Sequence, residues 1–334
     1  MVKNSMLVNY LILPIYLITM FLFCSLDSLF TSWFFLELNT ISFMILMSYL
    51  NKDTDCTFKY FLIQVVSSSI LMLSLMFFIN LTDLNLNYFM KILFNLSLLM
   101  KLGMVPFHSW YLHLIKKLNW LMYFLLTVNQ KFLPLLMLSY LYEEKILILV
   151  SLLTLLVTLL FSLNSFDLRL ILGYSSFNHL TWVIMMIMLD SNMWLTYFMF
   201  YFFINLNIIL YLNYYKIYKM NNLFFFNSIL KFFFIFSIFT LMGFPFTSGF
   251  FIKVNYMEIF EFNSLSMMLM LMFMVSTTMF LVYMRLMFYS LFNYSVISKR
   301  LLNLKKFNIF KFKFSLYMLN FFLFLTILIF FFFS

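Results

Sequence analysis

The stretch that decides the fold reads Met100-Lys101-Leu102-Gly103-Met104-Val105-Pro106-Phe107-His108-Ser109-Trp110. A lysine, a glycine and a proline stand here inside sequence that is otherwise largely apolar. A charge at the middle of a bilayer costs about 3 kcal/mol on insertion scales, so an intramembrane lysine indicates a functional site. Gly103 and Pro106 interrupt the helix, because proline removes a backbone donor and clashes with the preceding turn. The stretch predicts a broken membrane helix beside a titratable group. The alternative is a kinked helix whose lysine reaches up to the membrane surface.

The composition sets the class of the protein. The chain has 334 residues, of which 65% are hydrophobic and 10% charged, and its mean hydropathy is +1.03. Apolar runs of about 18 residues or more are typical of transmembrane helices and exclude a soluble domain. We therefore expect an all-α polytopic membrane protein that forms a single transmembrane domain over residues 1–334.

Residue usage points to the origin of the gene. The chain holds 51 Phe and 29 Met, four Gly and four Pro, and no alanine. This is the pattern of AT-rich coding, and the methionine count favours a code in which ATA reads as Met, as in animal mitochondria. Lys3 is the one charge ahead of the first apolar run, so no cleavable leader is expected. Cys24 and Cys56 fall near opposite ends of spans, which excludes a disulfide between them.

Hydropathy divides the chain into eleven helices of about 20 residues or more. Their ranges are 6–24, 28–50, 57–81, 89–116 (broken), 119–141, 145–163, 168–189, 193–215, 229–258 (broken), 263–290 and 314–333.

The charges between these spans are strongly asymmetric. Of the 21 Lys and Arg, three lie well inside spans and two, Lys91 and Lys145, belong to the side opposite the N-terminus. The remaining sixteen lie on the side of the N-terminus. By the positive-inside rule that side is the matrix, which predicts an N-terminus in the matrix and a C-terminus in the intermembrane space. The basic run Lys299–Lys313 fits a positive-inside loop; a partner for it is an anionic lipid such as cardiolipin rather than nucleic acid.

Four charged residues remain well inside the spans: Glu37, Lys101, Lys131 and Lys253. Apart from Gly173 and Pro14, all glycines and prolines stand near the three lysines, and we expect helix breaks at these positions: Gly103, Pro106, Pro134, Gly243, Pro245 and Gly249. Pairs of interrupted helices in matching halves of a chain point to the ion path of inverted-repeat transporters.

Two further predictions concern the titratable residues Glu37 and His179. Glu37 is expected to pair with Lys101, since removal from water penalises an unpaired charge. His179, inside the seventh span, is either a relay group or a hydrogen-bonded packing residue. No metal-ligand spacing, nucleophile motif or cofactor motif appears, so the chain can move protons or ions but shows no means of redox chemistry.

Several motifs occur in an order that resembles a known family. They are Lys101 to His108, Gln130-Lys131 with Pro134, Ser175-Ser176 with His179, Gly243 with Pro245, Gly249, Phe250 and Lys253, and Lys59 to Leu62 with Gln64. This combination resembles the NADH dehydrogenase subunit 2 family, the antiporter-like membrane subunits of mitochondrial respiratory complex I. The resemblance runs from about residue 30 to residue 290, and the residue usage resembles that of an insect member.

The resemblance implies roles for single residues. Glu37 matches the glutamate that partners the first lysine, Lys101; Lys131 matches the central lysine and Lys253 the lysine of the second broken helix. The resemblance and the buried charges together suggest a lateral proton path through Lys101, Lys131 and Lys253, with His179 as a relay. The sequence departs from the family pattern at Phe35, Asn129, Leu170 and Phe246, and Leu170 stands where a basic residue is usual at a matrix-side proton entrance.

The interpretation is a proton-translocating membrane-arm subunit of NADH:ubiquinone oxidoreductase in the mitochondrial inner membrane. It implies that this chain holds no cofactor, and that NADH, FMN, Fe–S clusters and ubiquinone bind to other subunits of complex I. Two alternatives remain open at this point: a free-standing cation/proton antiporter, and a purely structural membrane subunit whose buried charges fix helix packing.

Overall fold

A computed structural model of the chain describes residues 12–25, 28–51, 53–80, 84–189, 193–225, 228–245, 247–262 and 266–292. This part is helical and contains no strand, apart from one isolated bridge between Asp167 and Lys219. The chain forms two compact units: Met1–Val157 with Leu180–Ser191 make up unit 1, and Thr158–His179 with Asn192–Ser334 make up unit 2. The expected span 314–333 and the run Lys299–Lys313 lie outside the described residues.

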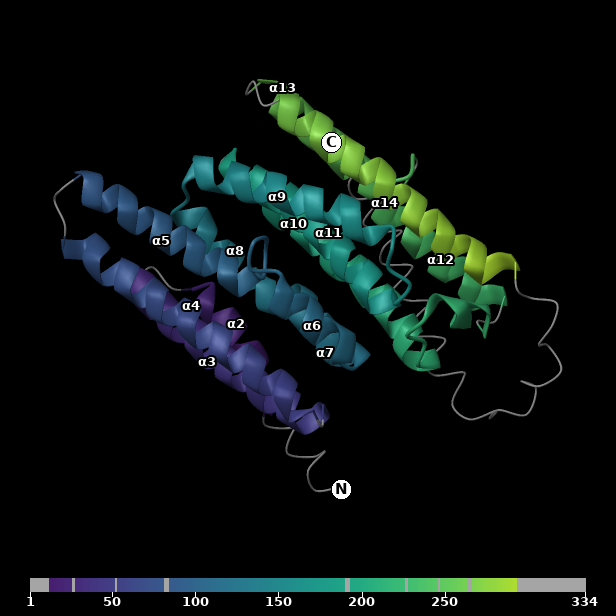
Figure 1. The fold of residues 1–334 in the computed structure, drawn as a ribbon, viewed down its shortest axis with the longest axis horizontal. Helices are drawn as coiled ribbons and strands as arrows, with labels where there is room; N and C mark the ends of the chain where they lie inside the picture. The colour runs from purple at the N-terminus through teal and green to yellow at the C-terminus, as the bar shows by residue number, and fades with distance from the viewer. Residues whose placement is uncertain are drawn as a thin grey trace. The chain divides into compact units, whose positions relative to one another are not determined.

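The described part of unit 1 is built from helices (Figure 1). They are α2 (Leu13–Phe23), α3 (Leu29–Leu50), α4 (Thr54–Asn80), α5 (Leu84–Leu102), α6 (Ser109–Lys117), α7 (Trp120–Phe124), the π-helix η2 (Leu125–Asn129), α8 (Gln130–Tyr140), most of α9 (Glu144–Ser162) and the second part of α10 (Leu168–Met188). Helix α4 packs against α3 and α5, and α8 packs against α3 and α5. The residues of α3, α5 and α8 that carry Glu37, Lys101 and Lys131 are thereby brought into one interior.

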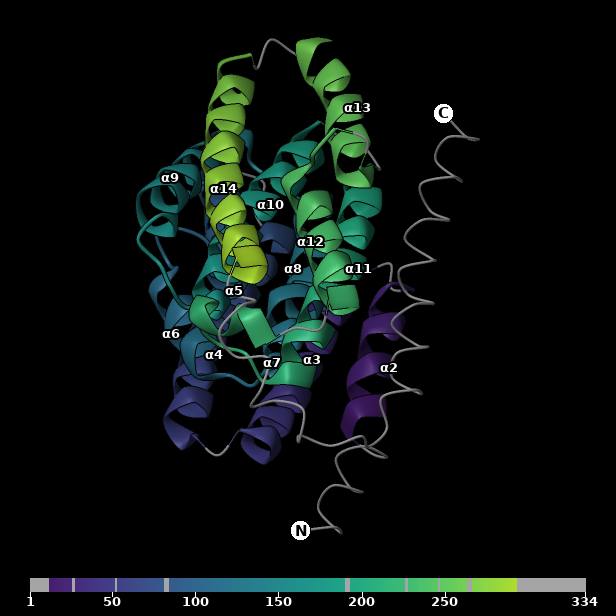
Figure 2. The same cartoon turned by 90° about the vertical axis from the view of Figure 1, so that its right-hand side faces the viewer.

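Unit 2 contains the second broken helix. Its elements are the first part of α10 (Leu168–Met188), α11 (Met193–Tyr215), the 3₁₀-helix η3 (Met220–Phe225), α12 (Ser228–Met242), α13 (Ser248–Phe262) and α14 (Ser266–Phe292). Helix α12 contacts α11, α13 and α14, and α13 lies beside α14 (Figure 2). The two halves of the broken helix therefore both lie against α14.

The all-α membrane fold is confirmed. Ten of the eleven expected spans fall wholly or mostly on described residues, and where both ends are described their helices begin and end within a few residues of the expected bounds; 193–215, for example, is α11. The first part of the expected span 6–24 lies outside the described residues. Among the described residues, seven helices are long and apolar enough to cross a membrane, and two apolar helices are shorter.

Both predicted breaks are present. Helix α5 ends at Leu102 and α6 begins at Ser109; α12 ends at Met242 and α13 begins at Ser248. The residue after each first half is a glycine with positive φ, +69° at Gly103 and +75° at Gly243. A glycine in this conformation ends helices because it has no Cβ to clash. In both halves of the chain, a glycine with positive φ therefore ends the first part of the broken membrane helix.

A helix break was expected at Pro134, but the helix is not broken there. Helix α8 continues through Pro134. It follows the π-helix η2 without interruption, so Trp120–Tyr140 forms one helical span that contains the proline. The irregularity lies earlier, in the π-helix η2 directly before Gln130, which no feature of the sequence indicated.

Serine takes the place of the missing small residues between packed helices. Ser67 and Ser74 of α4 and Ser97 of α5 are at most 1% exposed. Each hydroxyl donates to the carbonyl three residues earlier, at 2.7–2.8 Å, so its polar group is satisfied within its own helix. Small residues let membrane helices approach closely, and in this chain without alanine serine performs that role.

Arg285 of α14 supplies hydrogen-bond donors to the C-terminal end of α9, within unit 2. Its guanidinium donates to the carbonyl oxygens of Leu163 at 2.7 Å and Ser165 at 3.3 Å, and it lies 5.6 Å from the centre of the Phe166 ring. Carbonyls at a helix end have no intrahelical donors. Arg285 supplies donors to this end and ties it to α14.

Candidate functional site

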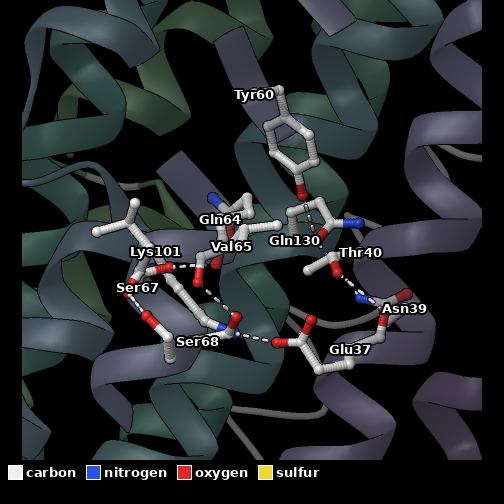
Figure 3. Close-up of polar contacts among 12 residues, drawn as sticks. Glu37, Asn39, Thr40, Tyr60, Gln64, Val65, Ser67, Ser68, Lys101 and Gln130 are labelled. Atoms are coloured by element: carbon white, nitrogen blue, oxygen red, sulfur yellow. Dashed lines mark hydrogen bonds and ion pairs between the residues drawn. The ribbon is translucent and has the colours of Figure 1, made fainter. Parts of the chain in front are cut away.

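Glu37 and Lys101 form the ion pair expected from the sequence. Lys101 Nζ of α5 donates to Glu37 Oε1 of α3 at 3.1 Å. The lysine side chain is 2% exposed and the glutamate side chain 23%. In Figure 3, Ser67 and Ser68 of α4 lie beside Lys101. The acid that lies well inside the predicted spans is thus placed against the first lysine.

The first residues of α6 pack against the turn that follows Lys101. A Cβ on Gly103 would lie 2.9 Å from the Cβ of Tyr111 and 3.1 Å from the Trp110 ring. The first distance is shorter than real Cβ contacts and the second is tighter than most, and φ at Gly103 is +69°, so a residue with a side chain would be strained here. The turn between α5 and α6 therefore brings Trp110 and Tyr111 back over the end of α5, next to Lys101.

Lys131 lies in the interior of unit 1, on the first turn of α8. It is 2% exposed, and its Nζ lies 4.4 Å from the centre of the Tyr111 ring. At this distance the face of the aromatic ring attracts an ammonium, by about 2 kcal/mol when the pair is desolvated. The aromatic residue that follows the break thus contacts the second lysine.

Lys101 and Lys131 line one cavity. Its volume open to the centre of a water molecule is about 10 Å³, roughly what a single water requires. The other polar side chains that line it include Tyr60, Gln64 and Gln130. Two ammonium groups on different helices therefore face the same space, a geometry that a proton relay requires.

Gln130 connects this cavity to three more helices. Its Oε1 accepts from Asn39 Nδ2 and Tyr60 Oη, and its Nε2 donates to Tyr16 Oη, each at 3.4 Å; Figure 3 shows Gln130 between Asn39 and Tyr60. Tyr16 was not expected from the sequence, because one tyrosine among 21 carries no positional signal. A side-chain amide that is fully buried is easier to recognise from the sequence as a hydrogen-bonding centre, because buried polar groups need partners.

The second broken helix places Lys253 in an equivalent setting. Lys253 Nζ of α13 donates to the carbonyl oxygen of Met242, the last residue of α12, at 3.0 Å. A Cβ on Gly243 would lie 3.0 Å from that Nζ, and one on Gly249 would overlap the Thr240 carbonyl oxygen. Gly249 is therefore required for the close approach of α12 and α13, whereas at Gly243 the nearest atom is the mobile end of Lys253.

His179 lies with Lys253 in unit 2. Its Nδ1 is 2.8 Å from Tyr197 Oη, and its ring packs on Tyr201 with centroids 4.9 Å apart. His179 and Lys253 line one cavity, with about 20 Å³ open to the centre of a water molecule. The five expected site residues thus fall into two groups: Glu37, Lys101 and Lys131 in unit 1, and His179 and Lys253 in unit 2.

Comparison with known proteins decides the family. A model of the NADH:quinone oxidoreductase/Mrp antiporter transmembrane family matches residues 27–281, a range that includes all five residues. NADH-ubiquinone oxidoreductase chain 2 of Anopheles gambiae is 32% identical over 228 residues, which are 66% of this chain and 67% of that protein. The chain belongs to the NADH-ubiquinone oxidoreductase chain 2 family. The chain 2 protein of Locusta migratoria is 29% identical over 278 residues, 77% of this chain and 78% of that one.

Solved structures support the fold of this chain 2 family member. A chain of respiratory complex I from Thermus thermophilus superposes with a TM-score of 0.78 at 18% identity, over 84% of this chain and 70% of that chain. A chain of the Mrp complex from Dietzia has a TM-score of 0.70 at 14% identity, over 78% of this chain and 56% of that chain. The antiporter-like membrane fold is shared across this distance.

Proposed function

We propose that this chain translocates protons as a membrane-arm subunit of NADH:ubiquinone oxidoreductase and carries no electrons itself. Membership of the chain 2 family supports its place in that enzyme. The observation that carries the proton-moving role is the arrangement in unit 1: Lys101 is paired with Glu37 and shares a water-sized cavity with Lys131.

The geometry suggests how one charge controls the next. Two unit charges about 4 Å apart interact by ~4 kcal/mol at the effective dielectric of a protein site. When Glu37 moves toward or away from Lys101, the field at the shared cavity changes, and Lys131 responds by taking or releasing a proton. The Tyr111 ring stabilises the Lys131 ammonium when it is charged. In unit 2, Lys253 and His179 provide the corresponding groups around their own cavity.

The remaining assignments follow from the same proposal. The N-terminus faces the matrix and the C-terminus the intermembrane space, by the asymmetry of the loop charges. The partners are other membrane-arm subunits of complex I and anionic lipid, and NADH, FMN, Fe–S clusters and ubiquinone are bound by those other subunits. The two units act together as one transmembrane domain.

The test replaces Lys131 by Met, which is similar in length and cannot titrate. Fully assembled enzyme with Lys131→Met is placed in sealed vesicles, and the protons moved per NADH oxidised are measured together with the turnover rate. A matched control is Lys145→Met, since Lys145 is an exposed lysine at the start of α9. We expect a lower rate or ratio for Lys131→Met and no change for the control. An unchanged ratio at an unchanged rate would remove Lys131 from the proton path and favour a structural subunit.

A second measurement addresses the antiporter alternative. Native protein is extracted in mild detergent and its assembly state is determined. We expect it to purify with the other subunits of complex I. A solitary chain that exchanges cations for protons in vesicles would instead establish a free-standing antiporter.

A further inference from the structure

A series of hydroxyl groups leads away from the cavity of His179 and Lys253. Tyr197 of α11 lies 2.8 Å from His179 Nδ1, measured to its Oη. Tyr256 of α13 donates to the carbonyl oxygen of Met193 at 2.6 Å and lies 3.2 Å from Thr196 Oγ1. The rings of Tyr197 and Tyr256 pack together with centroids 5.7 Å apart. All of these groups belong to unit 2.

The series has a direction. Met193 is the first residue of α11 and Thr196 lies in its first turn; Tyr197 follows Thr196 and lies four residues after Met193, about 6 Å along the helix axis at 1.5 Å per residue. Tyr197 and Tyr256 are 5% and 2% exposed, while Met193 and Thr196 are half-buried. The hydroxyls thus run from a buried cavity to the partly exposed beginning of α11.

Their hydroxyl groups distinguish Tyr197 and Tyr256 from aromatic residues that only fill space. Phenylalanine would fill the same space and is the commonest aromatic residue of this chain, with 51 Phe against 21 Tyr. A phenolic O–H both donates and accepts, so it can pass a proton on without becoming charged. Tyr201, by contrast, packs its ring against the same imidazole, with the two ring planes tilted by 38°.

We propose that Tyr197 and Tyr256 form a hydroxyl relay that carries protons between the cavity of His179 and Lys253 and the end of unit 2 at which α11 begins. This rests on the proposed function. A proton that arrives at His179 Nε2 makes the ring an imidazolium. The Nδ1 proton then passes to Tyr197 Oη as the hydroxyl proton of Tyr197 leaves, so His179 and Tyr197 both end neutral. A water molecule takes that proton to Tyr256 Oη, whose own proton leaves toward Thr196.

The charge distribution assigns this relay to one membrane side. Lys216, Lys219 and Lys231, beyond the other end of α11, belong to the side predicted to face the matrix. The beginning of α11 therefore faces the intermembrane space, and the relay is an exit. The positioning role of Tyr197 is to hold the imidazole with Nδ1 aimed at this exit.

The experiment compares Tyr197→Phe, Tyr256→Phe and a control, Tyr211→Phe, in assembled enzyme reconstituted into sealed vesicles. Tyr211 is a tyrosine of the same helix that is 1% exposed, fourteen residues past Tyr197 on the far side from the relay. Each Phe variant keeps the ring and removes one hydroxyl. We expect roughly tenfold slower coupled turnover in the two relay variants, a modest loss for general acid–base transfer, with a larger solvent isotope effect in D₂O. The control should match the unmodified enzyme.

Two outcomes overturn the relay. Unchanged turnover and isotope effect in both relay variants would do so, and so would an equal loss in Tyr211→Phe. Lys131→Met and Lys253→Met, measured in the same vesicles, separate this from failure of the proposed function: if the lysine variants lose pumping and the tyrosine variants do not, only the relay is wrong. Should Tyr197→Phe fail to assemble, Tyr256→Phe decides alone, because the Tyr256 hydroxyl bonds to the Met193 carbonyl and lies beside Thr196 at the start of α11.

Discussion

Lys253 of α13 donates its hydrogen bond to the carbonyl oxygen of Met242, so the lysine closes the end of the helix half that precedes its own. The Gly243 turn separates the two residues, and the 3.0 Å bond spans it. The same ammonium is therefore both a donor that holds the break together and a group proposed to exchange protons.

Two substitutions separate these roles. Lys253→Met removes the donor and the charge, and leaving a buried acceptor without its donor costs about 1–3 kcal/mol. Lys253→Gln keeps an N–H donor but cannot titrate. We expect a lower thermal midpoint and lost pumping for Lys253→Met, and lost pumping with a smaller shift in midpoint for Lys253→Gln. Full pumping in Lys253→Gln would confine Lys253 to a structural role.

The glycines of the second break should differ in their tolerance of alanine. In Gly249→Ala the new methyl group overlaps the backbone carbonyl of Thr240, which cannot move without displacing α12. In Gly243→Ala the nearest atom is Lys253 Nζ, the mobile end of a side chain, and the main penalty is about 1–2 kcal/mol for a positive φ. Gly249→Ala should therefore give less assembled enzyme than Gly243→Ala in a native gel. The reverse order would contradict the close approach of α12 and α13.

Glu37→Gln should disturb the first lysine. Removing one partner of a buried ion pair costs about 3–5 kcal/mol, and a smaller loss is expected here because the Glu37 side chain is 23% exposed. We expect slower coupled turnover, whereas Glu144→Gln, an exposed carboxylate at the start of α9, should have no effect. A double-mutant cycle with Lys101→Met measures the coupling, and a coupling energy near zero would mean that the pair does not act as a unit.

The aromatic contact of Lys131 can be tested with two substitutions at Tyr111. Tyr111→Phe keeps a ring 4.4 Å from the lysine, whereas Tyr111→Leu removes the attraction of about 2 kcal/mol between ring and ammonium. The number of protons moved per NADH and the rate should fall for Tyr111→Leu and change little for Tyr111→Phe. Equal effects of the two substitutions would show that the hydroxyl, not the ring face, matters.

Limited proteolysis tests the orientation. The loop at Glu143 belongs to the side expected to face the intermembrane space, and the loop at Lys216–Lys219 to the matrix side. Protease added to intact mitoplasts should cleave near Glu143 and spare Lys216–Lys219, and detergent should expose both. The opposite pattern would invert the topology.

The charged residues of the site were predictable because each of them is a charge within an otherwise apolar span. Lys101, Lys131, Lys253 and Glu37 are conspicuous inside apolar spans, and a paired glycine and proline mark each helix break. A charge in such surroundings needs a partner, which is why the Glu37–Lys101 contact could be expected before any coordinates were known.

The partners of these charges were not predictable. Lys253 bonds to a backbone carbonyl, and every residue of the chain has one. Tyr16, Tyr111 and Tyr197 are common residues in an aromatic-rich chain, so only their positions in space distinguish them. The π-helix before Gln130 reflects tertiary packing and leaves no mark on the hydropathy pattern.

The contact of Arg285 has a consequence for how the chain is made. Arg285 is synthesised 122 residues after Leu163, whose carbonyl oxygen it binds. At ~5–20 residues per second, synthesis of the intervening chain takes on the order of ten seconds. During that interval α9 has already been synthesised, but the arginine that closes its end does not yet exist. Unit 2 therefore becomes complete only when α14 enters the membrane, and chains truncated before that helix expose an unfinished α9 to quality-control proteases.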